Sequence, residues 1–455
     1  MKLEAWKYFS LIIVLVLSIG TGGAVLNPSP AAAAAPPEPT WWARYGSANE
    51  NQPTAIVADS QGNVYVTGCS NTGRWVYATA KYGKNYVVGQ APAWSTTWKL
   101  AGVDANFQAT AIALDSTGVY VTGCGYDASY NNIYYTLKYD LATGAQLWAS
   151  PATCVGESVS DPPHIAVDDS GVYVSGTTWR SSIDYVTIKY NKTTGATLWG
   201  PVYYDGAADN DNDYARGIAV YSGGVYITGY SEKHQQDPDN DWDDYFDLAT
   251  IKYDATTGSQ QWTHRIFTWD SSEQDQCYIA ADSSGVYVAA SSYLGNRRNT
   301  LTVKYPLNSA TPVWGPVYYG GQYGHDKPAG IAVDSSGAYV TGSINDSSGD
   351  DHYYTRKYGA ADGSVKWEKT YTTYIGDDRG IAVDSTGVYV SGYVRFTESP
   401  QYYKYATIKY ALSDGVELWS PAALFSGESF SYGCYAYAIT ADGSGGGLCH
   451  RLWLL

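Results

Sequence analysis

The stretch GIAVDSTGVYVSG, residues 380–392, is one of seven versions of the same text in this chain. Each version has an isoleucine near its start, and successive isoleucines lie 50 to 61 residues apart. Two short apolar runs flank a polar turn whose glycine can adopt a positive φ, so each version predicts a hairpin of two strands, a and b. The seven isoleucines are Ile56, Ile112, Ile165, Ile218, Ile279, Ile331 and Ile381.

Two further strands are expected after every hairpin. Text similar to YATIKY, residues 405–410, predicts strand c, and a turn such as NKTTG, residues 191–195, leads to a strand d that contains a tryptophan. Four antiparallel strands in a unit of this length match one blade of a β-propeller. The sequence therefore predicts an all-β propeller with seven full four-stranded blade repeats. The tryptophans are Trp98, Trp148, Trp199, Trp262, Trp314, Trp367 and Trp419.

An eighth unit begins at residues 437–446 and then loses the pattern. Near the start of the chain, TWWARYGS, residues 40–47, resembles the text of strand d. We therefore expect a truncated eighth blade that is completed in part by this N-terminal strand and that lacks its strand c. The alternative is a closed ring of seven blades with a spare N-terminal strand. A ring left open would expose the edges of its strands.

The last residues suggest why the eighth unit stops. Residues 447–454, GLCHRLWL, can be encoded by GGT CTA TGT CAC CGG CTA TGG CTA. Read one base later, this string encodes Val-Tyr-Val-Thr-Gly-Tyr-Gly, which is the expected strand b. We therefore expect residues 448–455 to be an out-of-frame tail, and the nucleotide sequence of the gene tests this expectation.

The N-terminus has the pattern of a secretory signal. Lys2 and Lys7 precede or enter an apolar run, and the alanine-rich region after it suits cleavage near residues 33–35. We expect a secreted, periplasmic or cell-surface protein. The alternative is an uncleaved membrane anchor, because the run at residues 8–26 is almost long enough to span a bilayer. The predicted organisation is a signal peptide and cleavage region at 1–35, a linker at 36–40, the propeller domain at 41–447 and the tail at 448–455.

Charge and cysteine usage limit the partners and the chemistry. The formal net charge is −16, and so acidic a chain repels phosphate backbones, which excludes nucleic acid as an expected partner. Six cysteines in an exported chain permit disulfides. Cys124 ends a strand b and Cys154 lies in a connection from strand d to the next strand a. Both positions belong to the same end of a blade, which makes these two the candidate disulfide, with isolated buried thiols as the alternative.

The repeat resembles that of a known group of proteins. The unit with the text AIAVDSSGVYVTGY followed by DYATIKY, in composite form, is similar to the repeat of exported prokaryotic β-propeller proteins called SBBP-repeat proteins. The segments DLATGAQLW, residues 140–148, and NKTTGATLW, residues 191–199, also resemble the tryptophan-docking motif of quinoprotein-type, or PQQ-like, propellers. The resemblance covers residues 41–445 and implies a propeller fold. It implies little about activity, because propellers bind, scaffold and catalyse.

Antiparallel order places the b–c and d–a connections at one end of every blade, and these connections differ in every unit. Variable loops on a uniform scaffold are where recognition is expected. Two acidic runs lie in such loops, and carboxylates at alternate positions suit a hard cation, so Ca²⁺ is the candidate cofactor. The alternative is a solvated acidic surface, since neither run has the glycine and glutamate of an EF-hand. The candidate ligands are Asp209, Asp211, Asp213, Asp237, Asp239 and Asp241.

Aromatic residues in the variable loops are the candidates for ligand binding, because with nearby Asn and Asp they could stack on and hydrogen-bond a sugar. These residues are Trp179, Trp242, Trp269 and Phe396. By contrast, we expect the tryptophan that recurs in strand d, and the lysine that recurs in strand c, to be structural. The lysine should pack its alkyl stem and direct its ammonium group to a carboxylate or a carbonyl.

No catalytic residue can be assigned from the sequence. It contains no G-x-S-x-G, no H-E-x-x-H and no phosphate-binding glycine loop. These observations favour a non-enzymatic, exported propeller that presents its variable loops to a protein or a glycan at the cell surface. The alternative is an enzyme, either a quinoprotein-like oxidoreductase or a glycan-active hydrolase or lyase, because paired carboxylates need only be close in space.

Overall fold

The computed structural model describes residues 9–15, 41–45, 51–87, 89–154, 159–206, 211–236, 242–270, 276–294, 297–321, 324, 326–372, 375–396, 402–419, 423–425, 434–441 and 447–454. Every regular element in these ranges is a β-strand. Nowhere in them is there a helix of the length and apolarity needed to cross a membrane.

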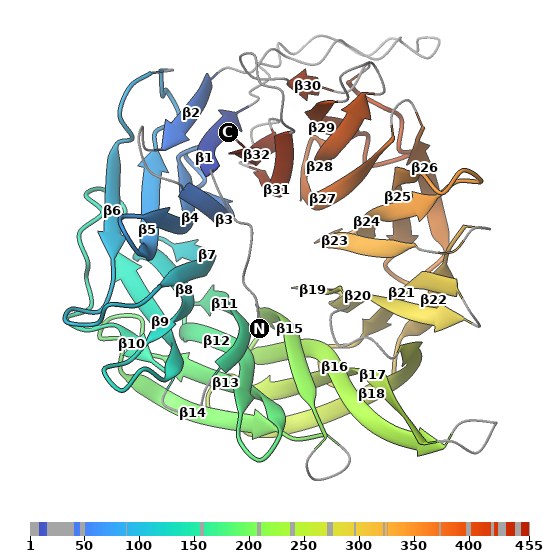
Figure 1. Cartoon of the computed structure of the whole chain (residues 1–455). Helices are drawn as coiled ribbons and strands as arrows, with labels where there is room; N and C mark the ends of the chain where they lie inside the picture. The colour runs from blue at the N-terminus through green and yellow to red at the C-terminus, as the bar shows by residue number, and fades with distance from the viewer. Residues whose placement is uncertain are drawn as a thin grey trace.

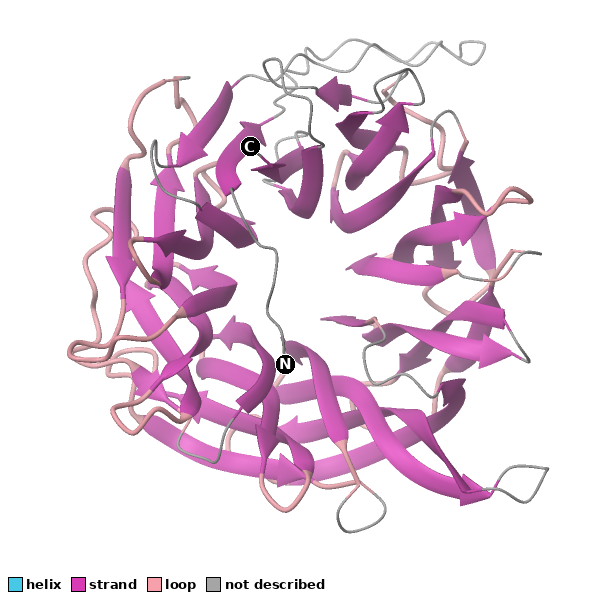
Figure 2. Ribbon diagram, viewed as in Figure 1, coloured by secondary structure: helices cyan, strands magenta, loops and turns pink. Residues whose placement is uncertain are grey.

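Seven four-stranded antiparallel blades stand side by side in a ring, as predicted (Figures 1 and 2). Each blade is one continuous segment in which strands a to d are neighbours in order. Blade 1 is β3 (Asn51–Ala58), β4 (Val64–Asn71), β5 (Trp75–Tyr82) and β6 (Trp94–Trp98); blade 2 is β7 (Gln108–Asp115), β8 (Gly118–Tyr126), β9 (Asn132–Tyr139) and β10 (Ala152–Thr153). Blade 3 is β11 (Val159–Asp168), β12 (Gly171–Trp179), β13 (Ile183–Tyr190) and β14 (Thr197–Tyr204).

The remaining blades repeat this order. Blade 4 is β15 (Asp213–Tyr221), β16 (Gly224–Gln236), β17 (Trp242–Asp254) and β18 (Gln260–Asp270). Blade 5 is β19 (Cys277–Asp282), β20 (Gly285–Leu294), β21 (Arg297–Tyr305) and β22 (Trp314–Tyr319). Blade 6 is β23 (Lys327–Asp334), β24 (Gly337–Asn345), β25 (Asp351–Gly359) and β26 (Val365–Tyr371); blade 7 is β27 (Ile375–Asp384), β28 (Gly387–Phe396), β29 (Tyr402–Tyr410) and β30 (Ala423–Phe425).

An eighth four-stranded sheet is built from both ends of the chain and lies between blades 7 and 1 (Figure 1). Its order is β31 (Cys434–Ala441), β32 (Gly447–Leu454), β1 (Phe9–Leu15) and β2 (Trp41–Tyr45). The N-terminal strand β2 occupies position d, as expected. The expectation that position c is empty is wrong, because β1 pairs with both β32 and β2.

Two segments with other predicted roles therefore form strands of this sheet. The run FSLIIVL of β1 belongs to the predicted signal, and its Ile and Val residues also suit an extended backbone. The predicted out-of-frame tail supplies most of β32, which pairs with β31 along its whole length. Strands pair through backbone N–H and C=O groups, so a segment whose side chains differ from the repeat can still form a strand of the sheet.

The innermost strand of every blade faces the ring axis. One cavity of about 370 Å³ is lined by strands a of blades 2 to 8. Its apolar lining is made of the isoleucines at one repeated position, which are Ile165, Ile218, Ile279, Ile331, Ile381 and Ile439. The repeat therefore places the same residue of successive blades around a common centre.

Neighbouring blades are joined by the recurring lysine and tryptophan. In blade 3, Lys189 Nζ and Trp199 Nε1 both donate to the carbonyl oxygen of Ala255, in the c–d turn of blade 4, at 2.7 and 3.0 Å. The same pair of bonds joins blades 1 and 2, 2 and 3, 5 and 6, and 6 and 7. The predicted structural role of both residues is confirmed.

The tryptophan of blade 1 that makes this contact is Trp94. Trp98, which the repeat pattern indicated, packs instead against Phe107 and Tyr135. Lys81 pairs with Trp94 across strands c and d, as Lys189 pairs with Trp199, so strand register and not distance along the chain selects the docking residue.

Candidate functional site: a buried carboxylate cluster at the loop face

The two ends of the ring differ in their connections. The a–b turns of blades 2 to 7 contain two residues each, whereas the d–a connections vary from three residues, 372–374, to nine, 99–107. The b–c connection of blade 4 is a hairpin arm in which β16 and β17 are 13 residues long and pair as far as Gln236 and Trp242. We call the end that carries the b–c and d–a connections the loop face.

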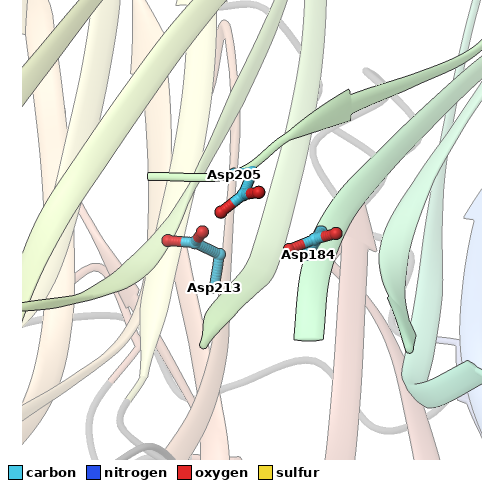
Figure 3. A group of neighbouring side chains, drawn as sticks. All are labelled: Asp184, Asp205 and Asp213. Atoms are coloured by element: carbon cyan, nitrogen blue, oxygen red, sulfur yellow. The ribbon is translucent and has the colours of Figure 1, made fainter. Parts of the chain in front are cut away.

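Three aspartates meet where blades 3 and 4 join at the loop face (Figure 3). Asp184 is the second residue of β13, Asp205 directly follows β14, and Asp213 begins β15. One carboxylate oxygen from each lies within 4.8 Å of the others. The site forms because the start of strand c and the end of strand d in one blade lie beside the start of strand a in the next.

The three carboxylates are only partly hydrogen-bonded. Asp184 accepts a bond from the Ser182 hydroxyl at 2.9 Å, and Asp213 Oδ2 accepts the Gly206 amide at 2.7 Å. Oδ1 of Asp205 and Oδ1 of Asp213 are buried and have no hydrogen-bond partner among the described residues. Buried carboxylate oxygens normally have partners, so these two acceptors are open to a ligand.

Burial sets the protonation of the cluster. The side chains of Asp184 and Asp213 are both 0% exposed. Burial raises the pKa of Asp213 to about 7; nearby hydrogen-bond donors and Arg265 oppose this rise, and the charge of Asp184 adds to it. Burial also raises the pKa of Asp184, and the charge of Asp205 adds to that rise. Near neutral pH, Asp213 is therefore poised between its neutral and charged forms.

Two guanidinium groups lie at the edge of the cluster. Arg265 Nε binds Asp247 at 3.0 Å, and its Nη2 donates to the carbonyl oxygens of Ser231 and Glu232 at 3.2 and 3.1 Å. Arg180, which is half exposed, lies 3.5 Å from Asp184. Asp247 offsets the charge of Arg265, so the cluster keeps an excess of negative charge.

The junction of blades 5 and 6 provides an internal comparison. There, the three equivalent positions relative to strands c, d and a hold Asn299, Gly320 and Asp326. Two of the three carboxylates are thus replaced by uncharged residues. The blade geometry alone does not require an acidic cluster.

The single carboxylate at that second junction is satisfied by the backbone. Asp326 Oδ2 accepts the Gly321 amide at 2.6 Å, which matches the bond from Gly206 to Asp213. Asp326 Oδ1 accepts the Asn345 amide at 3.2 Å. The corresponding oxygen of Asp213 has no backbone donor, and the Ser231 hydroxyl, which lowers the pKa of Asp213, makes no hydrogen bond of normal geometry with it.

The metal ligands predicted from the sequence are only partly brought together. Asp213 belongs to the cluster, whereas Asp211 is buried beside it, outside the group of three. Asp184 and Asp205 were missed, because neither lies in an acidic run. Comparing the residue three positions before the threonine of TIKY in every blade gives an aspartate in two blades, Asp184 in blade 3 and Asp247 in blade 4. Of the predicted ligands, Asp209, Asp237, Asp239 and Asp241 lie outside the described residues.

Of the predicted ligand-binding aromatics, Trp179 is at the loop face with 49% of its surface exposed. Trp242, Trp269 and Phe396 lie in β17, β18 and β28, and the described part of the structure does not include their side chains. The predicted loop arrangement is confirmed for Trp179, which ends β12.

The predicted disulfide between Cys124 and Cys154 is not formed, and both are free thiols. Cys124 in β8 pairs with Tyr134 in β9, and the Cys154 amide donates to the carbonyl oxygen of Tyr134 from the other side. The Cα atoms of the two cysteines are therefore two strand spacings apart, about 10 Å. A disulfide requires a Cα–Cα distance below about 7 Å. They do share one end of the blade, as expected.

The axial cavity has little polar chemistry in its described lining. Arg216 forms an ion pair with Asp161 at 3.0 Å. Burial and the charge of Arg216 lower the pKa of His164 to about 4, so this imidazole is neutral. Neither group is free to act as a cationic anchor for an acidic cofactor.

No protein-family model matches the chain, and no curated protein matches it. The SBBP-repeat resemblance is therefore not confirmed. Solved structures with a general likeness include the quinohemoprotein alcohol dehydrogenase from Comamonas testosteroni, at 10% identity and a TM-score of 0.44, covering 88% of this chain and 74% of that one. A europium-containing methanol dehydrogenase has 11% identity and a TM-score of 0.47, covering 89% and 92%. A GH32 β-fructofuranosidase from Bombyx mori has 9% identity and a TM-score of 0.34, covering 89% and 91%. Such distant likenesses carry no argument about the chemistry of this chain.

Proposed function

We propose that this chain is an exported or cell-surface binding and scaffold protein, which presents its b–c and d–a connections to a protein or glycan ligand. The observation that carries the proposal is the difference between the two ends of the ring. The a–b turns of blades 2 to 7 are nearly identical, whereas the loop-face connections differ in every blade and include the hairpin arm of blade 4. A rigid scaffold with one variable end is the usual arrangement of a recognition surface.

Trp179 is the residue we expect to contact a ligand. It is 49% exposed, and its neighbour Arg180 stacks on Tyr203 with 4.3 Å between the guanidinium carbon and the ring centroid. An exposed indole beside a fixed cation can stack on a sugar ring and hydrogen-bond its hydroxyl groups. A glycan is therefore the ligand class tested first.

The test is binding of the purified chain to an array of glycans and to isolated cell-wall polysaccharides, with Ca²⁺ or with EDTA. Trp179→Ala should weaken binding about tenfold or more if the indole stacks on a sugar. Val416→Ala is the matched control, because Val416 is 47% exposed but lies in a c–d turn at the opposite end of blade 7. Equal binding by both variants, or no binding to any glycan or protein ligand tested, would contradict the proposal.

Calcium is part of this proposal as the cofactor of the loop face. Ca²⁺ prefers carboxylate and carbonyl oxygens, and the described loop face contains buried carboxylate oxygens without partners. An ion bound there would reduce the repulsion between acidic groups beneath the ligand surface.

A glycan-active hydrolase is the second candidate. The observation in its favour is the raised pKa of Asp213 beside two other carboxylates, because glycosidases pair a neutral acid with a charged one. The burial of Asp184 and Asp213 opposes it, since a glycosidic bond would have to reach both side chains. Release of reducing ends from the bound polysaccharide, abolished by Asp213→Asn, would support this candidate over binding alone.

A further inference from the structure

We propose that one Ca²⁺ ion binds between Asp184, Asp205 and Asp213 and fastens blade 3 to the first strand of blade 4. The role of this ion in supporting a ligand surface rests on the proposed function. The binding of the ion itself is tested without any glycan or protein ligand.

The spacing of the three carboxylates fits this ion. Calcium binds oxygen at about 2.3–2.6 Å, so two ligands on opposite sides of the ion lie about 4.6–5.2 Å apart. The three oxygens lie within 4.8 Å of one another, which allows all of them to contact one ion. Three ligands leave positions for water, as is common at calcium sites.

The second observation is the unused hydrogen-bonding capacity of Asp213. Its side chain is 0% exposed, and its Oδ1 is buried without a partner. The equivalent Oδ1 of Asp326 is held by the Asn345 amide. A fully buried oxygen without a donor is costly, and a bound cation would satisfy it. At Asp326 the backbone supplies the donor, whereas at Asp213 the nearby group is the Ser231 hydroxyl, which lowers the pKa of Asp213 but makes no hydrogen bond of normal geometry with Oδ1.

Charged and titratable groups of both blades surround Asp213. Blade 3 contributes Asp184, Asp205, Tyr185 and Tyr204, and blade 4 contributes Arg265. Arg180 and Asp247 lie one contact further away. The two arginines face four aspartates, so a divalent cation would balance the remaining charge.

The consequence of binding is mechanical. Asp205 and Asp213 stand at the two ends of the d–a connection between blades 3 and 4, and Asp184 fixes the ion to strand c of blade 3. The ion would join Asp205, which follows strand d of blade 3, to Asp213, which begins strand a of blade 4. The same junction holds Trp179 and the hairpin arm of blade 4 at its rim, so calcium would order part of the proposed ligand surface.

The experiment is calorimetric titration of the metal-free chain with CaCl₂ at pH 7.5, followed by Tb³⁺ luminescence, which Tyr185 and Tyr204 are placed to sensitise. One ion per chain is expected. Asp205→Asn should weaken Ca²⁺ binding about tenfold or more, because a charged ligand is lost, and Asp184→Asn should do the same. Asp326→Asn is the matched control at the equivalent position of blade 6 and should bind one ion with unchanged affinity.

A shape-conserving change of the third ligand provides a second readout. Asp213→Asn keeps the shape of the protonated side chain, so it should fold and yet bind Ca²⁺ weakly. Wild-type affinity in Asp184→Asn and Asp205→Asn, or no bound ion in the wild-type chain, would overturn the proposal. Calcium binding without any glycan or protein binding would leave the ion site standing and refute only the proposed function.

Discussion

Lys189 and Trp199 share one acceptor, the carbonyl oxygen of Ala255 in the next blade. The acceptor oxygen has two lone pairs, and each donor uses one of them. Because the lysine lies in strand c and the tryptophan in strand d, the pair can reach the neighbouring turn only when both strands are in register. The contact therefore links the pairing of strands within a blade to the packing between blades.

Trp199→Phe should lower the free energy of unfolding more than Trp262→Phe does. Both changes replace a partly buried indole with a smaller ring, but only Trp199 loses a hydrogen bond, because Trp262 Nε1 is buried without a partner. We expect a difference of about 1–2 kcal/mol between the two variants, measured by urea unfolding. Equal destabilisation would mean that ring volume, and not the shared carbonyl, joins the blades.

Gly195→Ala should destabilise the chain more than Gly223→Ala. Both glycines have positive φ, 75° and 76°, so the backbone strain of an alanine is the same at each. A Cβ at Gly195 would lie 2.7 Å from Cδ2 of Trp148, whereas at Gly223 it would meet nothing within 4 Å. We expect Gly223→Ala to lower the free energy of unfolding by about 1 kcal/mol. Gly195→Ala should lower it by roughly 1–3 kcal/mol more. Thermal unfolding of the two variants checks this, and similar values would show that the tryptophan does not need a glycine beneath it.

Without calcium, the stability of the chain should fall as the pH rises from about 4 to about 7. The pKa of Asp213 is about 7 in the folded chain and near its ordinary value of 3.8 in the unfolded chain, so folding favours the protonated form. That advantage is complete below pH 4 and is lost as the pH passes through 7, at a cost of about 2–4 kcal/mol.

Asp213→Asn should remove this dependence, and saturating Ca²⁺ should reduce it in the wild-type chain. The measurement is urea unfolding at several pH values in EDTA and in CaCl₂. Parallel stability curves for the wild-type chain and Asp213→Asn would show that Asp213 does not titrate with the raised pKa.

The four cysteines whose side chains the structure describes should react slowly in the native chain. Burial raises the pKa of each thiol to about 12, and only the thiolate is reactive. A chain with Cys434→Ser and Cys449→Ser retains only Cys69, Cys124, Cys154 and Cys277. At pH 8, the thiols of the native chain should react with an aromatic disulfide reagent more slowly than those of the denatured chain, by roughly tenfold or more. Fewer than four thiols after denaturation without reductant would indicate a disulfide that the native strand spacing forbids.

The sequence by itself determined the blade, the number of continuous blades and the position of the isoleucines around the axis. These features repeat along the chain, and each hairpin depends on residues close together in sequence, such as Asp384 and Gly387 of one turn. The role of Lys189 in blade packing was also foreseen, because a charge that recurs in a buried strand needs a fixed partner.

Only the tertiary structure decided which side chains meet between blades. Asp184, Asp205 and Asp213 come together because three strand ends converge at one junction, and no spacing within a single repeat reveals that convergence. Cys124 and Cys154 were placed correctly at one end of a blade, but the strand between them keeps them apart. Periodicity is a local property of the chain, whereas these contacts depend on the relative positions of strands that belong to different segments or blades.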